Sequence, residues 1–211
     1  MPNRIKVLLP SVLVVLAAAA SSVPAQHPLE SLHDRAKKAG GKLIWRYRPN
    51  RSVIYPNIEE LAKRSSIIVV GRTVSQKPSL TKDGKFITQD FVVRVQEVIK
   101  GDVPNGHPLL VSLPGGAYRF DDDTYAYVMP IGYQPPQKGG MYIFFLNAKS
   151  KSSAFKGYTL VSGTQGLFAL KDRLVEPADL LATDPVVSRY KGMTAEAFLQ
   201  QIHKAVPRKK K

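Results

Sequence analysis

The sequence predicts a mainly β protein: an OB-like β-barrel, closed or partly open, with flanking N- and C-terminal α-helices. Phe86–Gly101 alternates apolar and polar residues, with Phe91, Val93 and Val95 on one face. Ile67–Val70 is β-branched throughout, and the turn at Asp83-Gly84 predicts that these two segments pair as a hairpin. Two long strands, each apolar on at least one face, require a closed or two-layered β core.

The alternation in the second of these strands changes phase after Gln96. Glu97 takes an inward position, and Val98 and Ile99 follow it as neighbours. An irregularity of this kind inside a strand is typical of a β-bulge, which bends a strand. We therefore expect the strand to curve at this point, as at a barrel corner.

The N-terminal segment has the pattern of a secretory signal peptide. Arg4 and Lys6 precede the apolar stretch Val7–Ala20, and the small residues of Val23-Pro24-Ala25 form a cleavage site. A membrane anchor is the alternative, but Pro10 interrupts the apolar stretch, which is shorter than the roughly 20 residues of a spanning helix. We expect cleavage near Ala25 and export to the periplasm or the medium.

Composition limits the chemistry available to the protein. The absence of cysteine from all 211 residues excludes disulfides, thiol nucleophiles and cysteine-ligated zinc or iron–sulfur sites. The signal segment carries two of the 31 basic residues and no acidic residue, which leaves 29 basic against 16 acidic residues and a net charge of +13. Such an excess predicts anionic surroundings.

The elements before the first long strand follow from spacing and capping. Pro28–Ala39 carries apolar residues at helical spacing and ends at Gly40-Gly41. Leu43–Tyr47 alternates as a strand, with Leu43, Trp45 and Tyr47 facing the core and mostly cationic residues facing water. Asn57 caps a helix that continues through Ala62.

Short strands and a final helix complete the predicted fold. The expected strands are Leu109–Leu113, Tyr125–Met129, Met141–Leu146, Tyr158–Ser162, Gly166–Leu170 and Leu174–Glu176. Thr194 caps a helix with one apolar stripe that ends before Pro207. The chain divides into a signal peptide (1–25), an N-terminal helix and strand extension (26–60), a β-barrel domain (61–176), a C-terminal helical segment (177–206) and a basic tail (207–211).

Two glycine-rich stretches are expected to serve as turns. Pro114-Gly115-Gly116 lacks the sequence context of a phosphate-binding loop, so its glycines are expected to adopt positive φ. The same interpretation applies to Gly163–Gly166. Within it, Gln165 is expected to bond backbone groups where strands cross.

Five segments together carry a resemblance: SSIIVVGRTVSQ, FVVRVQEVIKGD, PGG, GGMYIFFL and GTQGLFAL. Over about Leu61–Leu170 the chain resembles secreted bacterial proteins of unassigned function with an OB-fold-like barrel. That barrel is similar to the netrin-like module of tissue inhibitors of metalloproteinases. These inhibitors act through an N-terminal cysteine and disulfide-held loops, so the resemblance implies no inhibitory mechanism for this cysteine-free chain.

Cationic residues are the candidate binding groups. They form a dense segment and a free tail: Arg35, Lys37, Lys38, Lys42, Arg46, Arg48, Arg51, Arg208, Lys209, Lys210 and Lys211. We expect a non-enzymatic binding module, without a cofactor, for a protein, a glycan or an anionic envelope polymer or surface. The alternative is that the charges only maintain solubility. Strand alternation and export argue against nucleic acid, although Trp45–Arg48 interleaves rings with cations.

Asp121-Asp122-Asp123 is the dense acidic cluster of this basic chain. Asp121 and Asp123 are candidate Ca²⁺ ligands, although the loop lacks the other ligands of an EF-type site. A hydrolase using these carboxylates is the alternative function. It predicts a deep pocket that brings Asp121 or Asp123 to another titratable group. A binding module predicts a shallow, basic or aromatic face instead. The four histidines show no metal-ligand spacing.

Overall fold

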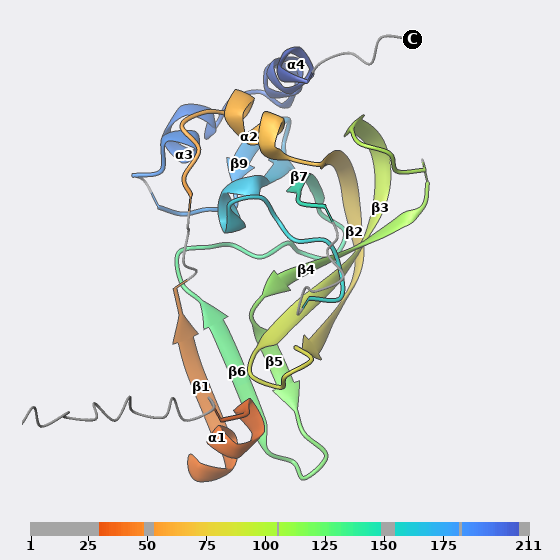
Figure 1. Cartoon of the computed structure of the whole chain (residues 1–211). Coiled ribbons are helices and arrows are strands. Elements are labelled where there is room, and N and C mark those ends of the chain that lie inside the picture. Colours follow the sequence, from red (N-terminus) through yellow and green to blue (C-terminus); the bar gives the residue numbers. More distant parts are fainter. Residues whose placement is uncertain (1–29, 49–52, 105, 149–154, 182, 207–211) are drawn as a thin grey trace, which may run out of the picture.

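A computed structural model describes residues 30–48, 53–104, 106–148, 155–181 and 183–206. The protein is mainly β, with two sheets and additional helices (Figure 1). The described strands are β1 (Lys42–Tyr47), β2 (Ile67–Leu80), β3 (Ile87–Lys100), β4 (Pro108–Pro114), β5 (Gly116–Arg119), β6 (Tyr125–Pro130), β7 (Met141–Leu146), β8 (Leu167–Lys171) and β9 (Leu174–Pro177). The helices are α1 (Leu32–Lys38), α2 (Ile58–Arg64), α3 (Pro185–Tyr190), α4 (Ala195–Ala205) and the 3-10 turn η1 (Gly163–Gly166).

The larger sheet is antiparallel, with strand order β4-β3-β2-β7-β8-β9. The long β2–β3 hairpin that the sequence predicts is present. The pairing of β2 with β3 shifts register between Val70 and Gly71, where β3 has one extra residue, Gln96. It shifts again between Ile68 and Val69, near the end of β3. The phase change in the sequence therefore marks a real bulge. Phe91, Val93 and Val95 are buried, as their alternation predicts.

The expected barrel closure is not found. The edge strands β4 and β9 of the six-stranded sheet do not pair with each other, and β1, β6 and β5 form a separate three-stranded sheet. The chain changes sheets at Gly115 and Gly116, which have φ of 103° and 123°, as the sequence predicts for this turn. A Cβ on Gly115 would lie 2.6 Å from Pro130 Cδ, so only glycine allows this approach.

Helices α2, α3 and α4 cover one face of the six-stranded sheet (Figure 1). Thr194 caps α4 as expected, and Phe198 and Ile202 are buried against that face. Helix α3 was not predicted, although Asp184 caps it and Pro185 begins it, which is a recognisable helix start. The predicted strand Tyr158–Ser162 is wrong: the segment forms only isolated bridges, and Ser162 adopts a left-handed conformation.

The N-terminal extension forms part of the smaller sheet. β1 pairs in parallel with β6, and β5 pairs antiparallel with β6 on its other side. Helix α1 packs on the inner face of this sheet through Leu32, beside Ala126 and Val128 (Figure 1). Within the described ranges, no helix is both long and apolar enough to cross a bilayer.

Candidate functional site

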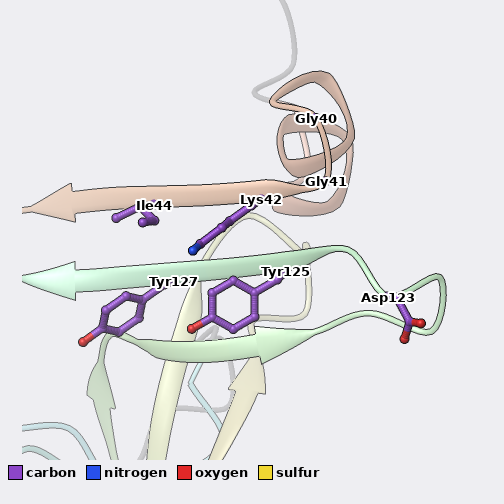
Figure 2. A pocket seen from close by; sticks show the side chains of 7 residues that line it. All are labelled: Gly40, Gly41, Lys42, Ile44, Asp123, Tyr125 and Tyr127. Atoms are coloured by element: carbon purple, nitrogen blue, oxygen red, sulfur yellow. The ribbon is translucent and has the colours of Figure 1, made fainter.

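The outer face of the three-stranded sheet combines cations with tyrosine rings. Alternation along each strand and the observed registers place one set of side chains on this side. The outer face comprises Lys42, Ile44 and Arg46 of β1, Tyr125, Tyr127 and Met129 of β6, and Ala117 and Arg119 of β5. Figure 2 shows Lys42, Ile44, Tyr125 and Tyr127 projecting from the same side of β1 and β6.

Cross-strand pairing sets the order of groups on the outer face. Tyr125 lies opposite Lys42 on one neighbouring strand and opposite Arg119 on the other, so a ring stands between two cations. In the next row, Tyr127 stands opposite Ile44, which is 56% exposed. The outer face is therefore solvent-accessible, aromatic in the centre and cationic at its sides.

Two of the outer-face cations, Lys42 and Arg46, differ from Arg119 in their ion pairing within the described ranges. Neither Lys42 nor Arg46 forms an ion pair with a residue in the part of the chain that the structure describes. Arg119 does so: its guanidinium lies 2.9 Å from Asp123. Because Lys42 and Arg46 are exposed and unpaired, their charge is available to an external anion.

A groove follows this face beside Gly40-Gly41 (Figure 2). Its walls include Lys42, Asp123, Tyr125 and Tyr127, and it is open to solvent. Asp123 is the one carboxylate among these lining residues, and it is paired with Arg119. General acid–base hydrolysis needs two carboxylates with separated pKa values in a cleft, and this groove does not assemble such a pair.

The remaining predicted cations do not share this face. The Arg35 guanidinium lies 4.6 Å from the centre of the Trp45 ring, on the inner side of the sheet. Lys37 Nζ is 3.0 Å from Asp122 Oδ2, and Lys38 pairs with Glu30. Arg48 is exposed immediately after β1. Arg51 and the tail Arg208, Lys209, Lys210 and Lys211 lie outside the described residues.

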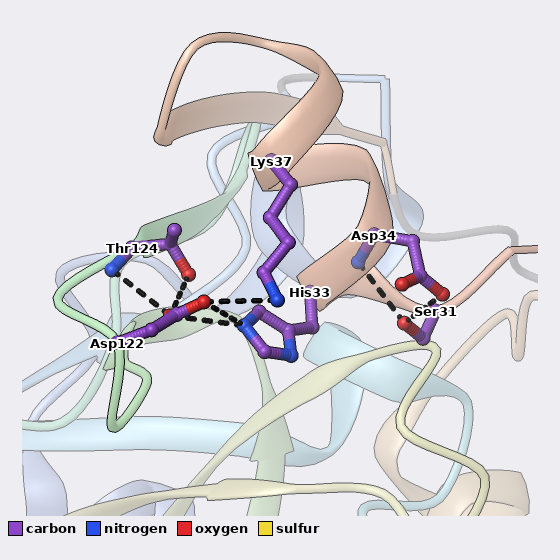
Figure 3. Close-up of polar contacts among 6 residues, drawn as sticks. All are labelled: Ser31, His33, Asp34, Lys37, Asp122 and Thr124. Carbon is purple, nitrogen blue, oxygen red and sulfur yellow. Dashed lines mark hydrogen bonds and ion pairs between the residues drawn. The ribbon is translucent and has the colours of Figure 1, made fainter.

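Asp122 organises the acidic loop (Figure 3). Its carboxylate accepts hydrogen bonds from the Thr124 hydroxyl at 2.7 Å and contacts His33 Nε2 at 2.9 Å and Lys37 at 3.0 Å. The His33 ring stacks on Phe120 with centroids 4.3 Å apart. These contacts fasten α1 to the β5–β6 turn. The bonds from Thr124, His33 and Lys37 hold the pKa of Asp122 well below its ordinary value.

The two candidate calcium ligands are separate from this cluster. Asp121 is exposed, and Asp123 is engaged with Arg119. Across the described ranges, no three histidine or carboxylate side chains come together in a way that could hold a metal ion.

The lowered pKa of Asp122 makes the α1 attachment sensitive to acid. A carboxylate with a depressed folded-state pKa stabilises the fold fully above its unfolded pKa and loses this contribution as the pH falls through the folded value. We therefore expect Asp122→Asn to lower the melting temperature above about pH 4, and the difference from wild type to shrink below it. Thermal melts of both proteins from about pH 2 to about pH 5 measure this. A difference that grows toward low pH would contradict the assignment.

No family model matches the sequence, and no curated protein matches it significantly.

The sequence pointed to only part of the outer face. Lys42 and Arg46 were predicted, but Arg119, Tyr125 and Tyr127 were not. The alternation in Tyr125–Met129 could have shown which tyrosines share a side. Their partnership with β1 depends on a parallel pairing between segments about 80 residues apart, which no local pattern reveals.

Proposed function

We propose that the protein is an exported, non-enzymatic binding module whose outer face binds an anionic glycan of the cell envelope. The observation that carries this is Tyr125 placed between Lys42 and Arg119, beside a second half-buried ring, Tyr127. An aromatic face accepts the weakly positive C–H face of a sugar ring, and Lys42 and Arg46, which form no ion pair among the described residues, pair with carboxylate or phosphate groups on the polymer.

The spacing of the outer face suits an extended, repeating chain. Residues two apart on a strand are separated by about 7 Å, so Lys42 and Arg46 lie about 13 Å apart along β1. Tyr125 and Tyr127 form a parallel row on the neighbouring strand. A polymer lying along the strands therefore meets first a ring flanked by cations at Tyr125, then a ring without a charge at Tyr127, and then the charge of Arg46. A flat lipid surface does not need this order.

Overall charge supports the same proposal. A net charge of +13 outside the signal segment attracts a polyanion from a distance and gives association that weakens with salt. This attraction carries little specificity. The arrangement on the outer face supplies the specificity, because it fixes where charges and rings lie relative to one another.

Two further expectations belong to this proposal. Export after cleavage near Ala25 would deliver the protein to the envelope. If the protein is related to the OB-like, netrin-like barrels, its two sheets are an opened form of that barrel. The bulged β2–β3 hairpin supports this relationship. Neither expectation adds a catalytic role.

A charge-matched pair of variants tests the function. Lys42→Ala/Arg46→Ala removes two outer-face cations, and Arg189→Ala/Lys191→Ala removes two exposed cations on and after α3, at the opposite end of the molecule (Figure 1). Binding to an oligouronate, with neutral dextran as control, is measured at about 50 mM and about 200 mM salt. We expect the outer-face variant to lose about tenfold or more in affinity, because each lost pair between a protein cation and a polymer anion costs about 1 kcal/mol or slightly less. The control variant should lose about twofold in affinity.

The contrast between variants decides the outcome. Equal losses in both would show that net charge alone drives association, and the outer face would not be the site. Tyr125→Ala should weaken binding further and Tyr125→Phe should not, because phenylalanine keeps the stacking surface. Circular dichroism of each variant checks that the small sheet remains folded.

A further inference from the structure

Strand β1 leaves one of its two edges without a partner among the described residues. It pairs only with β6 and is the outermost strand of the smaller sheet (Figure 1). The edge strands of the larger sheet are covered: Tyr158 exchanges backbone hydrogen bonds with β4, and segment 192–193 exchanges them with Val175 of β9. β5, the other edge strand of the smaller sheet, has only four residues. β1 is therefore the long open edge in the part of the chain that the structure describes.

The backbone groups at this open edge belong to residues of the outer face. The Gly41 and Tyr47 carbonyls accept hydrogen bonds from amides at the start of β6 and just after its end. The odd-numbered residues of β1 therefore direct their backbone groups to β6. Because successive residues of a strand direct these groups to opposite edges, the amides and carbonyls of Lys42, Ile44 and Arg46 point away from β6. They lie where an added strand would meet them.

The side chains at this edge define the sequence that suits it. Ile44 is 56% exposed, and Lys42 and Arg46 stand two residues before and after it on the same face. Both cations are exposed and form no ion pair within the described ranges. Side chains directly opposite one another on adjacent strands interact, so an acidic residue suits each cation and an apolar residue suits Ile44. The matching pattern is acidic–any–apolar–any–acidic, which reads the same in both chain directions.

A second copy of the protein does not suit this edge. Antiparallel pairing of two β1 strands about a two-fold axis at Ile44 would place Lys42 of each copy opposite Arg46 of the other. Like charges directly opposite one another destabilise a sheet, and charged side chains on an edge strand oppose self-association. The same charges favour an acidic partner, and the net charge of +13 outside the signal segment attracts one.

We propose that β1 binds an extended acidic segment of a partner protein as an added antiparallel strand, with the acidic–any–apolar–any–acidic pattern opposite Lys42, Ile44 and Arg46. Addition of a strand to an open sheet edge is a recurring mode of peptide recognition, and antiparallel pairing is slightly more stable per residue than parallel pairing. This binding goes beyond the proposed glycan binding. Both use the Lys42 and Arg46 side chains, but only the peptide bonds the backbone of β1.

Two peptides of equal composition and charge test the side-chain pattern: Thr-Glu-Thr-Val-Thr-Glu-Thr and Thr-Thr-Glu-Val-Glu-Thr-Thr, with both ends blocked. In an added strand the first places its glutamates on the same face as valine, and the second places them on the other face. Titration calorimetry at low salt should show the first peptide binding about tenfold more tightly than the second. Equal affinities would show that net charge alone drives binding and would refute the proposal.

N-methylation of the first peptide tests the backbone pairing. In the antiparallel arrangement valine exchanges both hydrogen bonds with Ile44, whereas the amides of the neighbouring threonines point away from β1. N-methylation of valine should therefore weaken binding about tenfold, and N-methylation of the threonine that follows it should leave the affinity unchanged. The reverse order, or the same affinity for both methylated peptides, would contradict the proposed pairing.

Amide hydrogen exchange of the full chain separates this proposal from the glycan proposal. Saturating peptide should slow exchange of the Ile44 and Arg46 amides about tenfold or more and hardly change the Trp45 amide, which faces β6. If oligouronate fails to bind while the peptide protects Ile44, the glycan proposal fails and this one stands. Slow exchange at Ile44 without peptide would show that the chain itself or a second copy already covers the edge. That result, or an Ile44 amide unaffected by saturating peptide, would overturn the inference.

Discussion

Replacing Phe168 with alanine is expected to destabilise the protein by about 3–5 kcal/mol, because the ring is fully buried at the junction of sheet and helices. Phe168 lies in β8, with ring centroids 5.7 Å from Phe145 and 4.8 Å from Phe198. Phe198 in turn contacts Tyr190 at 5.2 Å. The Phe168 ring therefore connects β8 to β7 and α4 directly and to α3 through Phe198, and its removal leaves a cavity that the surrounding residues cannot fill.

Chemical denaturation measures this cost. The midpoint should fall in Phe168→Ala with an unchanged dependence on denaturant, since the same surface is exposed on unfolding. Phe168→Leu is the matched control: it keeps most of the apolar volume and should be considerably less destabilising. If alanine cost less than about 1 kcal/mol, the helices would not be packed on the sheet as described.

Gln165→Met is expected to destabilise the protein by about 2–4 kcal/mol while hardly changing side-chain volume. The Gln165 amide is 1% exposed and bonds both backbone groups of Tyr55, each at 2.9 Å. Its nitrogen also donates to Asp184, which caps α3. Methionine would remove these bonds from the half-buried Tyr55 amide and carbonyl and from the buried Asp184 carboxylate, and the cost of that desolvation dominates.

An exposed glutamine provides the comparison for this substitution. Gln200 on α4 is exposed, and Gln200→Met should change the free energy of unfolding by less than about 0.5 kcal/mol. Equal effects at both positions, measured by denaturant unfolding, would show that Gln165 does not fasten the segment before α2 to the rest of the fold.

Local patterns in the sequence predicted much of the six-stranded sheet. The phase change after Gln96 located a bulge, because side-chain direction in a strand is visible from alternation alone. The uninterrupted apolar segment Met141–Leu146 predicted a strand buried on both faces, and β7 has these bounds. Gln165 was also predicted to bond backbone groups, since a polar residue between glycines must find a partner when buried.

Long-range pairing was beyond those patterns. The second sheet exists because β1 pairs in parallel with β6, and neither strand carries a signal that names its partner. β5 is only four residues long, too short for alternation to be recognised. The sequence therefore indicated one barrel where the chain forms two sheets. For the same reason it indicated one cationic segment, whereas folding separates Arg35 and Lys37 from Lys42 and Arg46.

Amide chemical-shift mapping with an oligouronate tests the central proposal most directly. We expect shifts that saturate with ligand and cluster on the outer face, at Lys42, Ile44, Arg119, Tyr125 and Tyr127, and that weaken as salt is raised. The amides of α3 and α4 should remain unchanged and serve as the internal reference. Shifts confined to those helices or to the residues beyond them, with the outer face unaffected at low salt, would contradict the proposal that this face binds the glycan.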